Sequence, residues 1–150
     1  MLCYCRQGFE PELAGELTER AAQAGIAGYA RTERDSGYVV FFCEDGEALD
    51  RALPFSELIF ARQKLRLLAE LAGLDPSDRI APMLAALPPA RSAGQAPLYG
   101  ELVMEHPDSD AGKPLAGLAR SLGNALRPAL RKNYLLSAQD SRRLPRLHVC

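Results

Sequence analysis

Positively charged side chains gather at the end of this 150-residue sequence and carry its clearest chemistry. From residue 113 onward the acids are reduced to Asp140 alone, against eight cations: Lys113, Arg120, Arg127, Arg131, Lys132, Arg142, Arg143 and Arg146. An arginine guanidinium is planar and can bridge two phosphate oxygens. A solvated helix surface would explain scattered arginines, but it does not explain the near-absence of acids. The pattern predicts a surface that contacts the phosphates of a nucleic acid.

The rest of the chain is acidic, with ten Lys/Arg against eighteen Asp/Glu before Lys113. The formal net charge of −1 therefore conceals an acidic body and a basic end. Tyr134 is the one aromatic residue among the basic side chains. We therefore expect these cations to recognise backbone shape or a helix end, because base stacking needs aromatic partners.

No catalytic arrangement can be assembled from the remaining residues. The end of the segment 108–113 is similar to that of two known motifs. It lacks the upstream glycine of a phosphate-binding loop, and its glycine falls one residue too early for a calcium-binding EF-hand loop. His106 and His148 have no nucleophile and orienting acid near them in the sequence. Glu101 and Glu105 share a predicted strand face, which is more typical of a solvated sheet than of an acid/base pair. The sequence predicts no catalytic residue.

The four cysteines and the composition place the chain among ordinary globular proteins. A zinc site from Cys3, Cys5, Cys43 and His148 is conceivable, but no pair has the usual ligand spacing, so buried thiols and no metal are expected. The sequence has no apolar run of membrane-spanning length and no secretory signal at its start. A cytoplasmic protein without a membrane partner is expected.

The first half has the pattern of a small α+β domain. The expected elements are a strand at 2–7, a helix at 10–23, a hairpin of strands at 26–32 and 38–43, a helix at 46–53 capped by Asp45, and a fourth strand. The fourth strand is placed in the apolar run 53–63, extending into 64–71, as an interior strand. The order β-α-β-β-α-β predicts a ferredoxin-like fold with both helices on one face of an antiparallel sheet.

The second half begins again after Gly73. We expect a helix from 75 to about 87, a strand at 98–105, a polar loop at 106–112, a helix at 113–122 broken at Gly123, and a further helix capped by Asn124 with Pro128 in its first turn. If the two helices were continuous, Lys113, Arg120, Arg127 and Arg131 would share the helix face opposite the leucines. A break at Gly123 would turn Arg127 and Arg131 away from the other two. A last strand begins at 143, and Leu147, Val149 and Cys150 are still apolar at its end, which predicts a domain that continues further.

Several segments resemble the RlmM-type methyltransferases, in order along the whole chain. They are CRQGFE at 5–10, SGYV at 36–39, LPFSELIFARQ at 53–63 and DRIAPM at 78–83, followed by Asp108 with Lys113, Leu126-Arg127, the triplet at 129–131, and His148-Val149. The eleven-residue run is the most specific of these. The family methylates a ribose 2′-hydroxyl of a cytidine in 23S rRNA with S-adenosylmethionine.

The resemblance implies two domains: a ferredoxin-like domain at 1–71 and a THUMP RNA-binding domain at 72–150 that lacks its final strands. It also implies a Rossmann-like domain beyond this sequence that holds the S-adenosylmethionine and the catalytic residues. On this hypothesis the chain alone is inactive, binds no cofactor, and positions 23S rRNA.

The residues expected to contact RNA are the eight cations of the basic end, with Arg6 and Arg62 as secondary candidates. Arg6 and Arg62 could instead anchor an interface between the two halves. The alternative function is a structural or self-association module of the same parent protein that makes no direct RNA contact.

Overall fold

The computed structural model describes residues 1–150, which form two compact units. The first contains Met1–Leu67 and Pro107–Pro114, and the second contains Leu68–His106 and Leu115–Cys150. The segment Pro107–Pro114 belongs to the first unit although it lies between two elements of the second.

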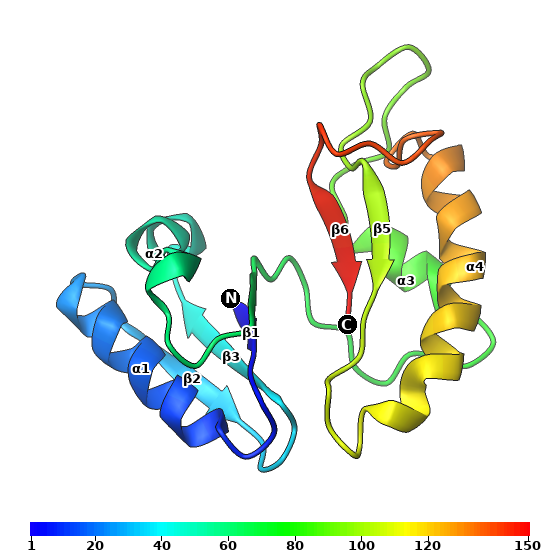
Figure 1. Cartoon of the computed structure of the whole chain (residues 1–150). Coiled ribbons are helices and arrows are strands. Elements are labelled where there is room, and N and C mark those ends of the chain that lie inside the picture. The colour runs from blue at the N-terminus through cyan, green and yellow to red at the C-terminus, as the bar shows by residue number, and fades with distance from the viewer. The chain divides into compact units, whose positions relative to one another are not determined.

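The first unit is a four-stranded antiparallel sheet with two helices on one face (Figure 1). Its elements are β1 (Leu2–Tyr4), α1 (Glu10–Gln23), β2 (Gly28–Thr32), β3 (Tyr38–Cys43), α2 (Gly46–Ala52) and β4 (Gln63–Leu65), with strand order β2-β3-β1-β4. This is the predicted ferredoxin-like arrangement. Both bounds of α1 and of β3 agree with the sequence prediction, and Asp45 caps α2 through hydrogen bonds from the backbone N–H groups of Glu47 and Ala48.

The two sheet faces differ because successive strand residues point to opposite sides. The helix-covered face holds a core of Cys3, Cys5, Leu13, Leu17, Ala21, Val39, Phe41, Leu49, Leu53 and Leu58. The other face, called here the helix-free face, carries Leu2 and Tyr4 from β1 and Val40 from β3, packed with Leu65 and Leu67. Cys3 and Cys5 are buried, as expected for structural thiols, whereas Cys43 is half-buried and Cys150 is exposed, so the expectation of buried thiols was wrong for these two.

The prediction of an interior strand within 53–63 was wrong. Phe55–Glu57 form a short 3-10 helix, and β4 is only Gln63–Leu65, at the edge of the sheet. The backbone N–H groups of Ile59 and Phe60 donate to the Glu16 carboxylate of α1, at 2.8 and 3.1 Å, and not to a neighbouring strand. Leu58 is buried in the core, whereas Ile59 is 77% exposed, so only one side of this run is buried and not both, as an interior strand would require.

The second unit pairs two parallel strands and packs helices against them. Its elements are α3 (Ile80–Ala85), β5 (Glu101–Met104), α4 (Ala116–Lys132) and β6 (Arg146–Val149), with Leu102 opposite Leu147 in the β5–β6 ladder. Its core joins Leu102, Leu126, Leu130, Leu135, Leu136 and Leu147. α3 begins later than the predicted start near Asp75, because Asp75 closes a turn with Ser77 and the Asp78 carboxylate accepts from Ala81 N–H. None of the helices has the length and apolar character needed to cross a bilayer.

The predicted break at Gly123 was also wrong, since α4 continues from Ala116 to Lys132. Gly123 is buried against Met104 of β5, and a Cβ there would lie 2.6 Å from the Met104 Cγ. The glycine therefore permits close helix–sheet packing and does not end the helix. Asn124 caps nothing, and Pro128 lies in the helix interior. Lys113 lies before α4, in a 3-10 turn over Lys113–Leu115.

Candidate nucleic-acid interface

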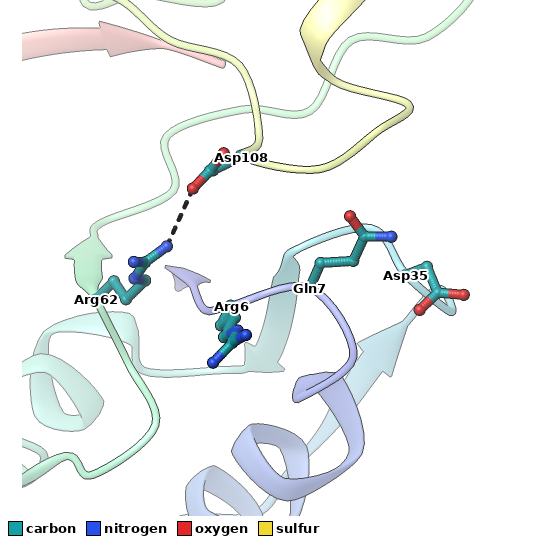
Figure 2. Close-up of a pocket in the computed structure, with 5 residues that line it drawn as sticks. All are labelled: Arg6, Gln7, Asp35, Arg62 and Asp108. Atoms are coloured by element: carbon teal, nitrogen blue, oxygen red, sulfur yellow. Dashed lines mark hydrogen bonds and ion pairs between the residues drawn. The ribbon is translucent and has the colours of Figure 1, made fainter.

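An open polar pocket of about 450 Å³ lies on the first unit. It is lined by Arg6, Gln7, Asp35, Arg62 and Asp108 (Figure 2). Arg6 follows β1 and Arg62 precedes β4, and the backbone N–H of Arg62 donates to the Tyr4 carbonyl at 2.8 Å. Pairing of the two strands therefore brings two arginines, 56 positions apart in the sequence, to one pocket.

The pocket wall is fixed by a buried carboxylate. Glu10 accepts hydrogen bonds from the backbone N–H of Gly37, at 2.7 Å, and from that of Gly8, at 3.1 Å. Burial alone would raise the pKa of the Glu10 carboxyl, but these backbone donors outweigh it and hold the pKa below its ordinary value. Gly8 and Gly37 both have positive φ, which turns their N–H groups toward the carboxylate.

The two pocket arginines differ in their contacts. Arg62 forms an ion pair with Asp108 at 3.2 Å, and Figure 2 shows its guanidinium pointing toward that carboxylate. The exposed Arg6 side chain points away from Asp108 and has no ion pair or hydrogen bond. Gln7 accepts from the backbone N–H of Asp110, which holds the segment Pro107–Pro114 in place. The pocket therefore contains two carboxylates and two guanidiniums. Of the two arginines, Arg6 can bind a phosphate without breaking an existing ion pair.

In the second unit the basic surface divides into paired and unpaired cations. Arg146 binds Glu101 at 2.9 Å. Arg131 Nε donates to the Ser137 carbonyl at 3.1 Å, and Arg127 reaches the Leu102 carbonyl at 3.5 Å. Both also lie within 4 Å of Asp140, the one acid from residue 113 onward. These three arginines are tied to the fold by contacts that the sequence did not indicate.

Four of the predicted phosphate-contacting residues are exposed and make no ion pair: Arg120, Lys132, Arg142 and Arg143. Arg120 and Lys132 lie on α4, and the other two lie on the loop before β6. Lys113 is separate, because it belongs to the first unit and binds Asp110 at 2.9 Å. The predicted face of Lys113, Arg120, Arg127 and Arg131 is therefore not a single face of one helix.

Amphipathic character explains why α4 presents cations beside a buried stripe. Gly123, Leu126 and Leu130 are buried, and Arg127 and Arg131 follow the last two by one position, at the margin of the stripe. Leu115 and Leu118, expected on the apolar side, are 45% and 46% exposed. The first turn of α4 therefore does not contribute to the core in the predicted way. Residues 115–150 carry seven Lys/Arg against one Asp, so the positive charge of the second unit is concentrated in this segment.

Two family models and a set of curated proteins match this chain. A family model described as "RlmM ferredoxin-like domain" matches residues 1–65, and one described as "Ribosomal RNA large subunit methyltransferase M, N-terminal" matches residues 78–150. Curated proteins named ribosomal RNA large subunit methyltransferase M are 67% identical in Xanthomonas campestris pv. campestris and 64% identical in Xanthomonas oryzae pv. oryzae and Xanthomonas axonopodis pv. citri. Each alignment covers all 150 residues of this chain but 42% of the relative.

Proposed function

The chain belongs to the RlmM family, and on that premise we propose that it is the RNA-recognising part of a 23S rRNA cytidine 2′-O-ribose methyltransferase. In this proposal a ferredoxin-like domain at 1–71 is followed by a THUMP domain at 72–150. The matched ranges, which end at 65 and begin at 78, support a boundary in that interval. The parent protein works on rRNA in the cytoplasm, and methyl transfer takes place in a part of the parent outside these residues.

The observation that carries the proposal is the group of unpaired cations in the second unit. Arg120, Lys132, Arg142 and Arg143 are exposed and have no carboxylate partner. Exposed cations without internal partners lose no ion pair when they bind phosphate, and they release counterions from the RNA. Arg127 and Arg131 share one carboxylate at nearly 4 Å, so they add positive charge to the same surface.

Residues of this chain do not fit S-adenosylmethionine. The pocket of the first unit is lined by two arginines, two aspartates and a glutamine, without an apolar slot for an adenine. The turn after β5 has no glycine-rich sequence, and its Gly112 lies so close to the Pro107 carbonyl that a Cβ there would be 2.1 Å from the oxygen. That glycine closes a tight turn and does not approach a ligand. The proposal therefore assigns the cofactor to the remainder of the parent protein.

The test is RNA binding by this chain over a salt series. Fluorescence anisotropy with a labelled, transcribed fragment of 23S rRNA should show binding that weakens linearly as log affinity is plotted against log salt. A DNA duplex of equal length serves as the comparison, because it carries the phosphates but not the A-form shape or the 2′-hydroxyls. Absence of binding at low salt would contradict the proposal.

A second candidate, a self-association or structural module, is favoured by exposed apolar side chains on the first unit. Ile59 is 77% exposed and Phe55 is 48% exposed, next to the stacked Phe9–Phe60 pair. Such side chains are typical of a protein contact. Light scattering across protein concentration separates the two candidates: a mass that doubles, together with no RNA binding, supports the second.

A further inference from the structure

The helix-free face of the first unit carries a concentration of aromatic side chains. The strand register places Tyr4 beside Tyr38 and Tyr29 beside Phe42 on this face. Val40 and Leu2 complete its centre, where β1 and β3 are buried with Leu65 and Leu67. The β2 side of the same face stays open, because the Tyr29 side chain is 63% exposed.

Three residues on the open side form a preassembled group, called here the β2–β3 aromatic patch: Tyr29, Arg31 and Phe42. The rings of Tyr29 and Phe42 are stacked, with centroids 5.2 Å apart and planes 21° apart. The Arg31 guanidinium lies over the Phe42 ring, 5.1 Å from its centroid. The Tyr29 ring is thus held in a fixed plane by its neighbour while most of its surface remains open to solvent.

Charge distinguishes the two faces of this unit. The acids of the helices, among them Glu12, Glu19, Glu47 and Asp50, belong to elements that pack on the opposite face. The strand positions of the helix-free face are Leu2, Tyr4, Tyr29, Arg31, Tyr38, Val40, Phe42, Gln63 and Leu65. They include one arginine and no carboxylate. A polyanion could therefore approach this face of an otherwise acidic unit without meeting a negative side chain on the sheet.

We propose that the β2–β3 aromatic patch binds an unpaired base of single-stranded RNA by stacking on Tyr29, with Arg31 beside it to contact the adjoining phosphate. This inference rests on the proposed function and adds the form of the substrate, an RNA that contains an unpaired segment. A base has a π-face whatever its identity, so the patch selects for strand flexibility and not for sequence. A four-stranded sheet with aromatics on its helix-free face is a general solution for splaying out RNA bases.

The experiment compares single-stranded and duplex RNA. Anisotropy is measured with a short fluorescein-labelled single-stranded RNA of mixed sequence and with a hairpin of the same composition. Tyr29→Ala should weaken binding of the single strand about ten-fold, as expected for one lost stacking contact. It should leave hairpin binding and the salt slope unchanged, because no phosphate contact is removed. Tyr29→Trp should restore single-strand affinity, and Phe55→Ala, an exposed aromatic outside the patch, should have no effect.

A direct readout uses the wild-type chain. Single-stranded RNA containing 4-thiouridine should cross-link to the tryptic peptide 21–31, which contains Tyr29, or to peptide 35–51, which contains Phe42. If Tyr29→Ala does not fold by circular dichroism, Tyr29→Leu takes its place, since leucine retains apolar packing on Phe42 but offers no ring.

The outcomes separate this inference from the proposed function. Equal loss of single-strand and hairpin affinity in Tyr29→Ala, or no loss at all, overturns the patch while RNA binding by the basic surface stands. Failure of the wild-type chain to bind either RNA overturns both.

Discussion

The carboxylate of Glu10 and the backbone N–H of Gly37, 27 residues apart, are joined by a 2.7 Å hydrogen bond inside the first unit. This bond connects the start of α1 to the turn between β2 and β3, and it fixes the segment that carries Arg6 and Gln7. The side chain has almost no exposed surface. The sequence shows Glu10 only as one of several acids at the start of a helix, whereas the structure shows that it holds the backbone on either side of the pocket residues Arg6, Gln7 and Asp35.

Replacing Glu10 by Ala should lower the free energy of unfolding by about 2 to 3 kcal/mol, because buried N–H groups lose their charged acceptor. Glu12→Ala removes an exposed acid two residues further along α1; it is the matched control and should change stability little. Urea denaturation monitored by circular dichroism measures both. An equal effect of the two substitutions would contradict the role given to Glu10.

The same carboxylate predicts an acid-dependent loss of stability. Its pKa is lowered in the folded state, so its contribution is fully present above the unfolded pKa of about 4.3. The contribution is lost as the pH falls through the lower folded pKa. Wild-type stability should therefore decline below about pH 4.3 more steeply than that of Glu10→Gln, as measured by urea midpoints over a pH series. Parallel declines would refute this assignment.

Opposite effects are expected from two alanine substitutions in α4. Gly123→Ala should destabilise by about 1 to 2 kcal/mol because its Cβ meets Met104. Gly117→Ala, at a position with open space, should stabilise by up to about 1 kcal/mol through helix propensity. Thermal melting measures both, and adding Met104→Ala to Gly123→Ala should recover part of the loss. A stabilising Gly123→Ala would show that the helix–sheet contact is not close.

Reversal of the charge of Arg131 should lower the stability of the fold, because this side chain contacts the Ser137 carbonyl and Asp140. In Arg131→Glu a carboxylate would face the Ser137 carbonyl and Asp140. The expected loss of stability is about 2 kcal/mol, whereas Lys132→Glu, on the exposed neighbour, should change stability by less than about 0.5 kcal/mol. Chemical denaturation of the two variants checks this, and equal stabilities would contradict it.

RNA affinity should depend instead on the unpaired cations. Arg120→Gln and Arg143→Gln should each weaken binding to all RNA sequences and reduce the slope of log affinity against log salt by about 1. Arg51→Gln, an exposed arginine on the acidic first unit, is the control. Unchanged slopes in both test variants would remove these side chains from the interface.

Elements whose start and end signals lie close together in the sequence could be predicted. The bounds of α1 follow from a proline in its first turn and Gly25 after its end, and the Asp45 cap needs only the next three residues. The run 53–63 could not be assigned in this way, because Glu16, more than 40 residues earlier, takes the N–H groups of Ile59 and Phe60.

The candidate site shows the same limit. Composition identified the cations, but which of them are available depends on where Asp140, Glu101 and the Ser137 carbonyl lie. The integrity of α4 at Gly123 likewise depends on Met104, which the local sequence does not reveal. Period-two alternation in β2 and β3 could have indicated the aromatic face, since Tyr29, Arg31, Tyr38 and Phe42 alternate with residues of the core.

The assignment of Pro107–Pro114 to the first unit has a consequence for synthesis of the protein. The ribosome releases β1 through β4 well before it makes this segment, so the emerging first unit lacks Asp108 and the backbone that Gln7 binds. Completion of that unit must wait until β5 has also been translated. The two units are therefore expected to fold at overlapping times during translation, because the first unit becomes complete only when part of the second has already been synthesised.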